Sequence, residues 1–559
     1  MRIRCTQFTP IHRSPSGNGS TRAAMSLSFS KPSSLMLAVS LALGLPMSAT
    51  ASFPAEIELS SLDGNNGFVI NGELEDDFSG RSVSDAGDVN GDGIDDLIIG
   101  AHGADPNDTY SGRSYLVFGT DDDLPNPLNL SSLNRLNGIV FNGEAADHRA
   151  GWSVSGNGDI NGDGIEDLII GAILFDPNGS IVGSGRSYVV FGSNSGLPNP
   201  FDLSSINQLN GFALDGEAEE DGAGWSVSAD GDFNGDGIND LIIGAPLADP
   251  NGETSGRSYV VFGSNAGLPN PFNLSTLNGS NGFVINGEAA GNFFGARVGT
   301  AGDVNGDGID DLIIGAYLAD FKGVEAGRSY VIFGSTTGLP TPFNLSTLNG
   351  SNGFVINGEA AGDRLGNSVS AAGDFNGDGI DDLVIGAPGL PASSVLGRTY
   401  VVFGSNAGLP NPFDLSTLNG TNGFAINGEA AGDRLGVSVS AAGDVNGDGF
   451  DDLVIGAPVA SPNGLISGRT YVVFGSSVDL PNPFQLGSLD GSNGFVLNGE
   501  AAGDVSGASV SAAGDINGDG IDDLIVGAQG ATPNGSDSGR SYVIFGRGDT
   551  VFSDRFERE

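Results

Sequence analysis

Seven copies of a nine-residue acidic loop carry the side chains of this sequence that are best suited to chemistry. The copies begin at Asp88, Asp159, Asp232, Asp303, Asp374, Asp444 and Asp515, and each runs into a short apolar stretch. Positions 1, 3 and 5 offer side-chain oxygens, position 7 offers a main-chain carbonyl and position 9 a carboxylate. Oxygen donors at alternate positions of a Gly-rich turn are what Ca²⁺ requires. The pattern predicts a calcium site in each loop, up to seven structural ions in all.

The predicted ligands occupy positions 1, 3, 5, 7 and 9 of each copy. They are Asp88, Asn90, Asp92, Ile94, Asp96, Asp159, Asn161, Asp163, Ile165, Asp167, Asp232, Asn234, Asp236, Ile238, Asp240, Asp303, Asn305, Asp307, Ile309, Asp311, Asp374, Asn376, Asp378, Ile380, Asp382, Asp444, Asn446, Asp448, Phe450, Asp452, Asp515, Asn517, Asp519, Ile521 and Asp523. Position 9 is Asp in every copy, whereas position 8 varies (Asp95, Glu166, Asn239). This difference favours a ligand at position 9 and a solvent-facing side chain at position 8.

Two other interpretations fit part of the loop. An EF-hand loop needs an acidic ligand at position 12, where a helix opens. Position 12 is apolar in every copy, Ile in six of them from Ile99 to Ile455 and Val526 in the seventh, and the residues around it have strand character. An Asx-rich turn without an ion is the other alternative, because Asp, Asn and Gly are common in turns. Seven identical placements of three Asp and one Asn argue against it.

Residue types suited to catalysis are scarce outside these loops. Beyond the N-terminal leader the sequence has two histidines, His102 and His148, and one lysine, Lys322. Neither histidine lies in a recognisable nucleophile motif, so both are expected to be surface substitutions. The sequence lacks the His/Cys clusters that zinc requires. We therefore predict no catalytic residue, no organic cofactor and no enzymatic activity.

The elements that position the loops form a repeat of four strand-like segments. In the fifth copy these are 353–359, 367–373, 382–388 and 397–404, bounded by Gly, Asn and Pro. No intervening stretch shows a helical apolar period. Four short antiparallel strands describe a propeller blade, so the fold class predicted is all-β, a seven-bladed β-propeller. The first strand-like segment, 67–73, is left over and is expected to close the last blade, which removes its open edge.

The repeat resembles a known family. The order Gly-x-Ser-Val-Ser, Asp-x-Asn-Gly-Asp-Gly-x-x-Asp and Gly-Ala-Pro is similar to the FG-GAP repeat of the integrin alpha-subunit N-terminal domain, over residues 57–546. This resemblance implies a seven-bladed β-propeller with Ca²⁺ in the loops that join the first two strands of blades. Integrin propellers place such ions in only some blades, whereas this chain has the loop in all seven.

The N-terminal segment has the features of a secretory signal peptide. Lys31 precedes an apolar run at 35–45, Ala49-Thr50-Ala51 offers a cleavage site, and Met25 is a plausible start. The domains predicted are a leader (1–51), the propeller (52–546) and a short tail (547–559). Without the five basic residues of the leader, 17 basic residues face 69 acidic ones, a surface that repels nucleic acid. No other apolar run approaches a transmembrane length, so we expect a secreted, cell-surface or periplasmic protein.

The function predicted is an exported calcium-binding propeller that mediates macromolecular binding, with a protein or glycan ligand and an adhesion role. Sequence differences among the repeats concentrate in stretches such as 173–184 and 317–326, where recognition is expected. The alternatives are an extracellular hydrolase or lyase on a propeller scaffold and a purely structural envelope protein. Trp152 and Trp225, at one repeat position, are expected in core packing. The Arg at the start of each GR(S/T)Y segment is expected to pair with a nearby acid.

Overall fold

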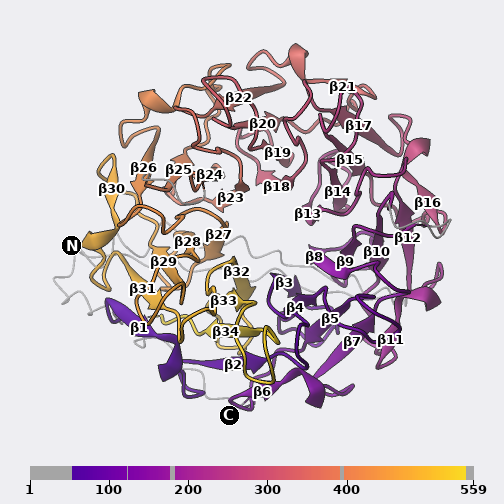
Figure 1. Ribbon diagram of the computed structural model, residues 1–559. Helices are drawn as coiled ribbons and strands as arrows, with labels where there is room; N and C mark the ends of the chain where they lie inside the picture. The colour runs from indigo at the N-terminus through magenta and orange to yellow at the C-terminus, as the bar shows by residue number, and fades with distance from the viewer. Residues whose placement is uncertain (1–52, 123, 177–182, 391–395, 549–559) are drawn as a thin grey trace, which may run out of the picture. The chain divides into compact units, whose positions relative to one another are not determined.

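A computed structural model describes residues 53–122, 124–176, 183–390 and 396–548, all of which belong to the compact unit Ser48–Glu559. The predicted leader and all but the first two residues of the predicted tail lie outside the described residues. Seven sheets are arranged around a centre, with the innermost strand of each facing it (Figure 1). The prediction of an all-β, seven-bladed propeller is confirmed.

Each blade starts with its innermost strand and continues outward in antiparallel order through four strands. The first four blades are β3 (Ser82–Gly87), β4 (Asp96–Ala101), β5 (Arg113–Val117) and β7 (Gly138–Asn142); β8 (Ala150–Gly158), β9 (Asp167–Ala172), β10 (Arg186–Val190) and β12 (Gly211–Asp215); β13 (Ser226–Gly231), β14 (Asp240–Ala245), β15 (Arg257–Val261) and β17 (Gly282–Asn286); and β18 (Arg297–Gly302), β19 (Asp311–Ala316), β20 (Arg328–Ile332) and β22 (Gly353–Asn357). The last three are β23 (Ser368–Gly373), β24 (Asp382–Ala387), β25 (Arg398–Val402) and β26 (Gly423–Asn427); β27 (Val439–Gly443), β28 (Asp452–Ala457), β29 (Arg469–Val473) and β31 (Gly494–Asn498); and β32 (Ser509–Gly514), β33 (Asp523–Ala528), β34 (Arg540–Ile544) and β2 (Gly67–Asn71).

A short parallel strand extends six of these sheets to five strands, where four were predicted. These strands are β11 (Phe201–Asp202), β16 (Phe272–Asn273), β21 (Phe343–Asn344), β30 (Phe484–Gln485), β1 (Glu56–Glu58) and β6 (Leu128–Asn129), in blade order and without the fourth blade. Six Leu-Pro-x-Pro connectors occur in the chain, the first at Leu124 and the last at Leu480, and five of these short strands begin directly after one. The short strands cover the outer edges, which removes unpaired backbone groups from solvent. In β2, for example, the Val69 N–H donates to the Asn126 side chain at 3.0 Å.

The helices in the described residues are single 3₁₀ turns, six of them after these connectors and the first after β1. They are η1 (Leu59–Ser61), η2 (Leu130–Ser132), η3 (Leu203–Ser205), η4 (Leu274–Thr276), η5 (Leu345–Thr347), η6 (Leu415–Thr417) and η7 (Leu486–Ser488). None of them has the length and apolar character of a membrane span.

The second strand of each blade is buried along its whole length, because neighbouring blades cover both of its faces. Apolar side chains form seven clusters between the blades. One of these joins the first and last blades, with Phe68, Ile99 and Val543 among its members. Burial on both faces explains why these strands read as continuous apolar runs rather than as alternating ones.

The N-terminal segment closes the ring, as predicted. Strand β2 pairs antiparallel with β34, from Gly67 opposite Ile544 to Asn71 opposite Arg540 (Figure 1). A Cβ on Gly67 would lie 2.1 Å from the Val543 carbonyl oxygen, so only glycine fits at the start of this strand. Strand β1 adds a contact that was not predicted, because it pairs in parallel with β31 of the sixth blade.

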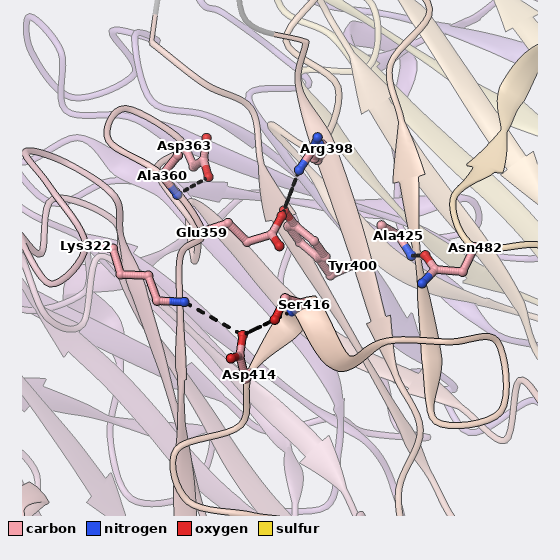
Figure 2. A network of polar contacts seen from close by, with 10 residues as sticks. All are labelled: Lys322, Glu359, Ala360, Asp363, Arg398, Tyr400, Asp414, Ser416, Ala425 and Asn482. Carbon is pink, nitrogen blue, oxygen red and sulfur yellow. Dashed lines mark hydrogen bonds and ion pairs between the residues drawn. The ribbon is translucent and has the colours of Figure 1, made fainter.

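Ion pairs connect each blade to the next. Glu359 follows β22, and its carboxylate accepts from Arg398 of β25 at 2.7 Å and from the Tyr400 hydroxyl at 2.8 Å (Figure 2). The same Glu–Arg–Tyr arrangement recurs in all seven blades, and the seam between last and first is bridged by Glu73 and Arg113. The expectation that each of these arginines pairs with a nearby acid is confirmed.

The two faces of the propeller carry different connections. The loops that join first to second strands, such as 88–95, lie on one face, which we call the metal-loop face. The segments that join second to third strands, such as 102–112, lie on the opposite side because the strands are antiparallel. We call that side the connection face. The innermost strands begin there, since Ser82 pairs with Gly100.

Candidate functional site

The predicted calcium ligands all lie in the loops of the metal-loop face. In each blade, positions 1, 3, 5 and 7 of the acidic loop fall between the first and second strands, and position 9 is the first residue of the second strand. The sequence pattern therefore brings each set of five residues into one short turn. In the first loop, Gly91 and Gly93 have φ of 75° and 92°. These left-handed conformations favour glycine and let the backbone curl around the side chains.

Hydrogen bonds hold the first loop in a compact turn. The Asp88 carboxylate accepts from the N–H of Asp92 at 2.9 Å and of Gly93 at 2.6 Å. The Asp92 carboxylate accepts from Ile94 N–H at 3.1 Å. The Asn90 amide donates to Asp96 at 3.3 Å. Equivalent bonds recur in the other six loops. The backbone thus fixes the side chains that would surround an ion.

The position 9 carboxylates are buried and lack a cationic partner in the described structure. Asp96 is fully buried, and its Oδ1 accepts from Gly119 N–H at 3.0 Å. Burial raises its pKa to about 8, and the nearby charges of Asp92 and Asp88 contribute to the rise. The same causes raise the pKa of the other position 9 residues, to about 8 in five loops and well above the usual value at Asp452.

This donor set fits a hard cation. Three carboxylates, an amide and a carbonyl give the oxygen-rich ligand set that Ca²⁺ binds, and a dication would neutralise the mutual repulsion of the carboxylates. In the described residues, no three His, Cys, Asp or Glu side chains converge as a metal centre. The loop carboxylates are turned instead onto backbone N–H groups and the Asn amide. Calcium binding therefore stays a prediction.

The position 8 side chains are not solvent-facing, and that expectation is wrong. Asp95 is half-buried and its carboxylate accepts from the N–H of Asp515, the first residue of the loop in the preceding blade, at 2.9 Å. Asn239 does the same for Asp159 at 3.1 Å, and four other loops repeat the contact. Asn239 can replace Asp at position 8 because its amide oxygen accepts the same bond.

His102 does not lie on the surface, where the sequence interpretation put it. It is 8% exposed, and its ring lies 5.5 Å from that of Phe78 and 5.0 Å from that of Trp152. Burial lowers its pKa to about 3, with a further contribution from nearby arginines, so the imidazole is neutral. His148 is half-buried, with its ring 4.7 Å from that of Phe175.

Trp152 and Trp225 are half-buried and line a central cavity rather than packing in the core, so that expectation is wrong too. The signal that could have located this cavity was a departure from the repeat. Arg297 stands where the other six blades have Ser, at Ser82, Ser153, Ser226, Ser368, Ser438 and Ser509.

Comparison with protein families identifies the repeat. The FG-GAP repeat model matches residues 80–117, 223–261, 294–332, 365–402, 435–473 and 506–544. Each match runs from the start of an innermost strand to the third strand of the same blade. Six of the seven blades are therefore matched individually.

Curated relatives fall into two groups. The chain is 29% identical over 419 residues to the phosphatidylinositol-glycan-specific phospholipase D of Bos taurus, and 27% identical over 427 residues to that of Homo sapiens. Each alignment covers 72% of this chain and 46% of the relative, so the chain spans about half the length of these relatives. It is also 26% identical over 318 residues to integrin alpha-4 of Xenopus laevis, which covers 57% of this chain and 26% of the integrin.

These relatives correct one prediction and confirm another. The prediction that the chain is not an enzyme is wrong, because it is similar to phospholipases D, which are enzymes, over most of its length. The predicted family is confirmed by the six repeat matches and by the similarity to integrin alpha chains. The chain is an FG-GAP repeat protein that resembles the integrin alpha β-propeller and is related to phosphatidylinositol-glycan-specific phospholipase D.

Proposed function

We propose that this protein is an exported β-propeller, stabilised by Ca²⁺ in its acidic loops, that binds macromolecules through its connection face. The observation that carries the calcium part is the seven-fold recurrence of a buried Asp beside two further carboxylates, with no cationic side chain paired to it among the described residues. Leaving such charge uncompensated is costly. A bound dication removes that cost in every blade.

Calcium removal tests this part directly. Anything that binds only the folded state stabilises it, by about 2.7 kcal/mol per site when the free ligand is at 100 times its Kd. The midpoint of thermal unfolding should therefore rise with Ca²⁺ and fall with EDTA, and Mg²⁺ at the same concentration should restore less of it. An unchanged midpoint after chelation would remove calcium from the proposal.

The binding part is supported by the distribution of exposed apolar side chains. Phe321 and Val324, 55% and 68% exposed, lie in the connection between β19 and β20, and Leu465, 75% exposed, lies in that between β28 and β29. Tyr110, Leu390 and Leu396 are also in connections of this kind. Six of the ten large apolar side chains that are exposed in the described residues therefore lie in these connections, and clusters of exposed apolar groups are typical of interaction surfaces. The connections also differ among blades, as a selective binding surface requires.

Matched surface variants test the binding face. Phe321→Ser and Val324→Ser change the connection face, whereas Leu136→Ser and Leu209→Ser remove exposed apolar side chains just before β7 and β12, away from that face. We expect binding to extracellular matrix proteins or to a glycan array, measured in Ca²⁺, to fall in the first pair only. Equal effects in both pairs would show that the connection face is not the binding surface.

Hydrolysis of phosphatidylinositol-glycan is a second candidate, favoured by the similarity to phospholipases D over 72% of the chain. The test is release of a reporter protein from its glycosylphosphatidylinositol anchor in detergent micelles. Release that follows the purified chain through chromatography supports an enzyme. No release with the intact protein, under conditions where a known phospholipase D releases the reporter, would leave binding as the proposed function.

A further inference from the structure

A cavity of about 200 Å³ lies on the axis of the ring, at the connection face. It is lined by the first residues of the innermost strands, and all seven blades contribute. Figure 1 shows these strands, β3, β8, β13, β18, β23, β27 and β32, around the centre. Because the repeat places one residue of each blade at each level, any asymmetry in this cavity comes from individual substitutions.

One level of the cavity is a ring of serines broken by an arginine. The Ser82 hydroxyl accepts from Val154 N–H of the next blade at 3.1 Å, and Ser226, Ser368, Ser438 and Ser509 make the same bond onward. In the fourth blade the serine is replaced by Arg297. Its guanidinium cannot make this bond and instead donates to the neighbouring Ala296 carbonyl at 2.8 Å. The substitution removes one possible acceptor from this set of bonds and places a positive charge in the cavity.

The position directly before this serine in the repeat holds a second arginine and two tryptophans. Arg81, Trp152 and Trp225 occupy one repeat position in the first three blades, where other blades have Ala296, Asn367, Val437 or Ala508. The Arg81 guanidinium lies 4.4 Å from the centre of the Trp152 ring, and the Trp152 and Trp225 rings are 5.3 Å apart. Both indoles are half-buried, so part of each ring remains available to a ligand.

The positive charge of this cavity is uncompensated. Among the described residues that line it, none is acidic. In the described part of the chain, neither Arg81 nor Arg297 makes an ion pair. Burial lowers the pKa of both, and the charge of Arg297 contributes to lowering that of Arg81 to about 10. In a chain with a formal charge of −47, two unpaired arginines in one small cavity need another source of negative charge.

We propose that the axial cavity binds an anionic sugar, with its phosphate, sulfate or carboxylate held between Arg81 and Arg297 and its ring against Trp152 and Trp225. Guanidinium groups bind oxyanions through paired N–H donors. Indole rings supply flat apolar surface beside polar groups. The volume is below the roughly 300 Å³ at which drug-sized pockets begin, so it suits one sugar unit rather than an extended chain.

This inference goes beyond the proposed function. It concerns a small ligand in the axial cavity, and it holds whether or not the surrounding connections bind a macromolecule. It also does not depend on the acidic loops, which lie on the opposite face.

Titration calorimetry of the full protein in Ca²⁺ tests the proposal, with glucose phosphate, glucose sulfate, glucuronate, glucose and inorganic phosphate as probes. The main variant is Arg297→Ser, which restores the residue of the other six blades and should therefore fold. Trp225→Ala places at that position the residue found at Ala296 and Ala508. Arg135→Ser removes an equal charge from an exposed site outside the cavity and is the control. Arg81→Gln is the second variant if Arg297→Ser does not fold.

We expect at least one anionic sugar to bind and neutral glucose not to bind. Arg297→Ser should weaken that binding about tenfold or more, because it removes charged hydrogen bonds in a half-buried site. Arg135→Ser should leave it unchanged, and Trp225→Ala should weaken the sugar anions but not inorganic phosphate. The proposal is overturned if no anionic probe binds or if neutral glucose binds as tightly as the anionic sugars. It is also overturned if Arg297→Ser, or Arg81→Gln in its place, leaves the affinity for the anionic sugars unchanged. The sugar assignment would be overturned if inorganic phosphate binds as tightly as the anionic sugars and Trp225→Ala leaves the binding of those sugars unchanged.

Discussion

The closure of the ring by its N-terminal strand makes a sharp prediction about Phe68. This side chain lies in β2, is 1% exposed, and its ring is 5.9 Å from that of Phe545 at the end of the last blade. It belongs to the apolar cluster between the last and first blades. If β2 is a full member of the last blade, Phe68→Ala must open a cavity in that cluster.

The size of the effect follows from burial. Replacement of a fully buried Phe by Ala costs about 3–5 kcal/mol. A domain of this size has an unfolding entropy of about 1 kcal/mol/K, so the thermal midpoint should fall by about 3–5 °C. The loss of unfolding free energy should be no smaller than for the same substitution in an internal blade, because β2 is paired and packed in the last blade as the fourth strand of any other blade is.

Phe212 provides the matched control. It occupies the equivalent position in β12 of the second blade, is 2% exposed, and its ring is 5.9 Å from that of Phe191. Phe212→Ala and Phe68→Ala should lower the midpoint in differential scanning calorimetry by similar amounts. A cost below about 1 kcal/mol for Phe68→Ala, beside a full cost for Phe212→Ala, would refute closure by β2.

Three further predictions concern the loops and the seam. Asp96→Asn should reduce the calcium stoichiometry, measured by titration calorimetry, by one ion, whereas Asp95→Asn should not, because Asn239 serves at the same position of another loop. In EDTA, the free energy of unfolding should fall as pH rises from about 4 to 8, because burial raises the folded-state pKa of Asp96 and five of its equivalents to about 8, and that of Asp452 well above its usual value, so the folded state holds protons that the unfolded chain has lost. The slope is at most about 1.4 kcal/mol per pH unit for each loop, and excess Ca²⁺ should flatten it. A free energy of unfolding that rises with pH in EDTA would contradict this cause. Glu73→Gln should cost about 1–3 kcal/mol in urea unfolding, because Arg113 and Tyr115 lose a charged acceptor, whereas Glu75→Gln at an exposed site should cost almost nothing.

Much of this fold could be predicted because the same local sequence pattern occurs seven times in the chain. Seven copies of one strand pattern indicated seven blades, and the unmatched segment at Gly67 indicated the closing strand. The short strand β1 and the role of Asp95 could not be predicted, because both depend on contacts between blades. Asp95 meets Asp515 across the seam, 420 positions away in the chain. No local pattern reports such a contact.

The two faces of the ring differ in how closely they follow the repeat. The regular face suits a role in stabilising the fold, and the irregular one suits selective binding of a ligand. On the metal-loop face every blade presents the same donor set, which suits a task that each blade needs, such as neutralising its own buried Asp. On the axis at the connection face, three blades break the pattern with Arg81, Trp152 and Trp225, and a fourth with Arg297. A symmetric scaffold gains nothing in packing from these residues, since smaller side chains serve in the other blades. Residues that depart from the repeat and converge on one cavity are therefore better explained by a ligand than by the fold.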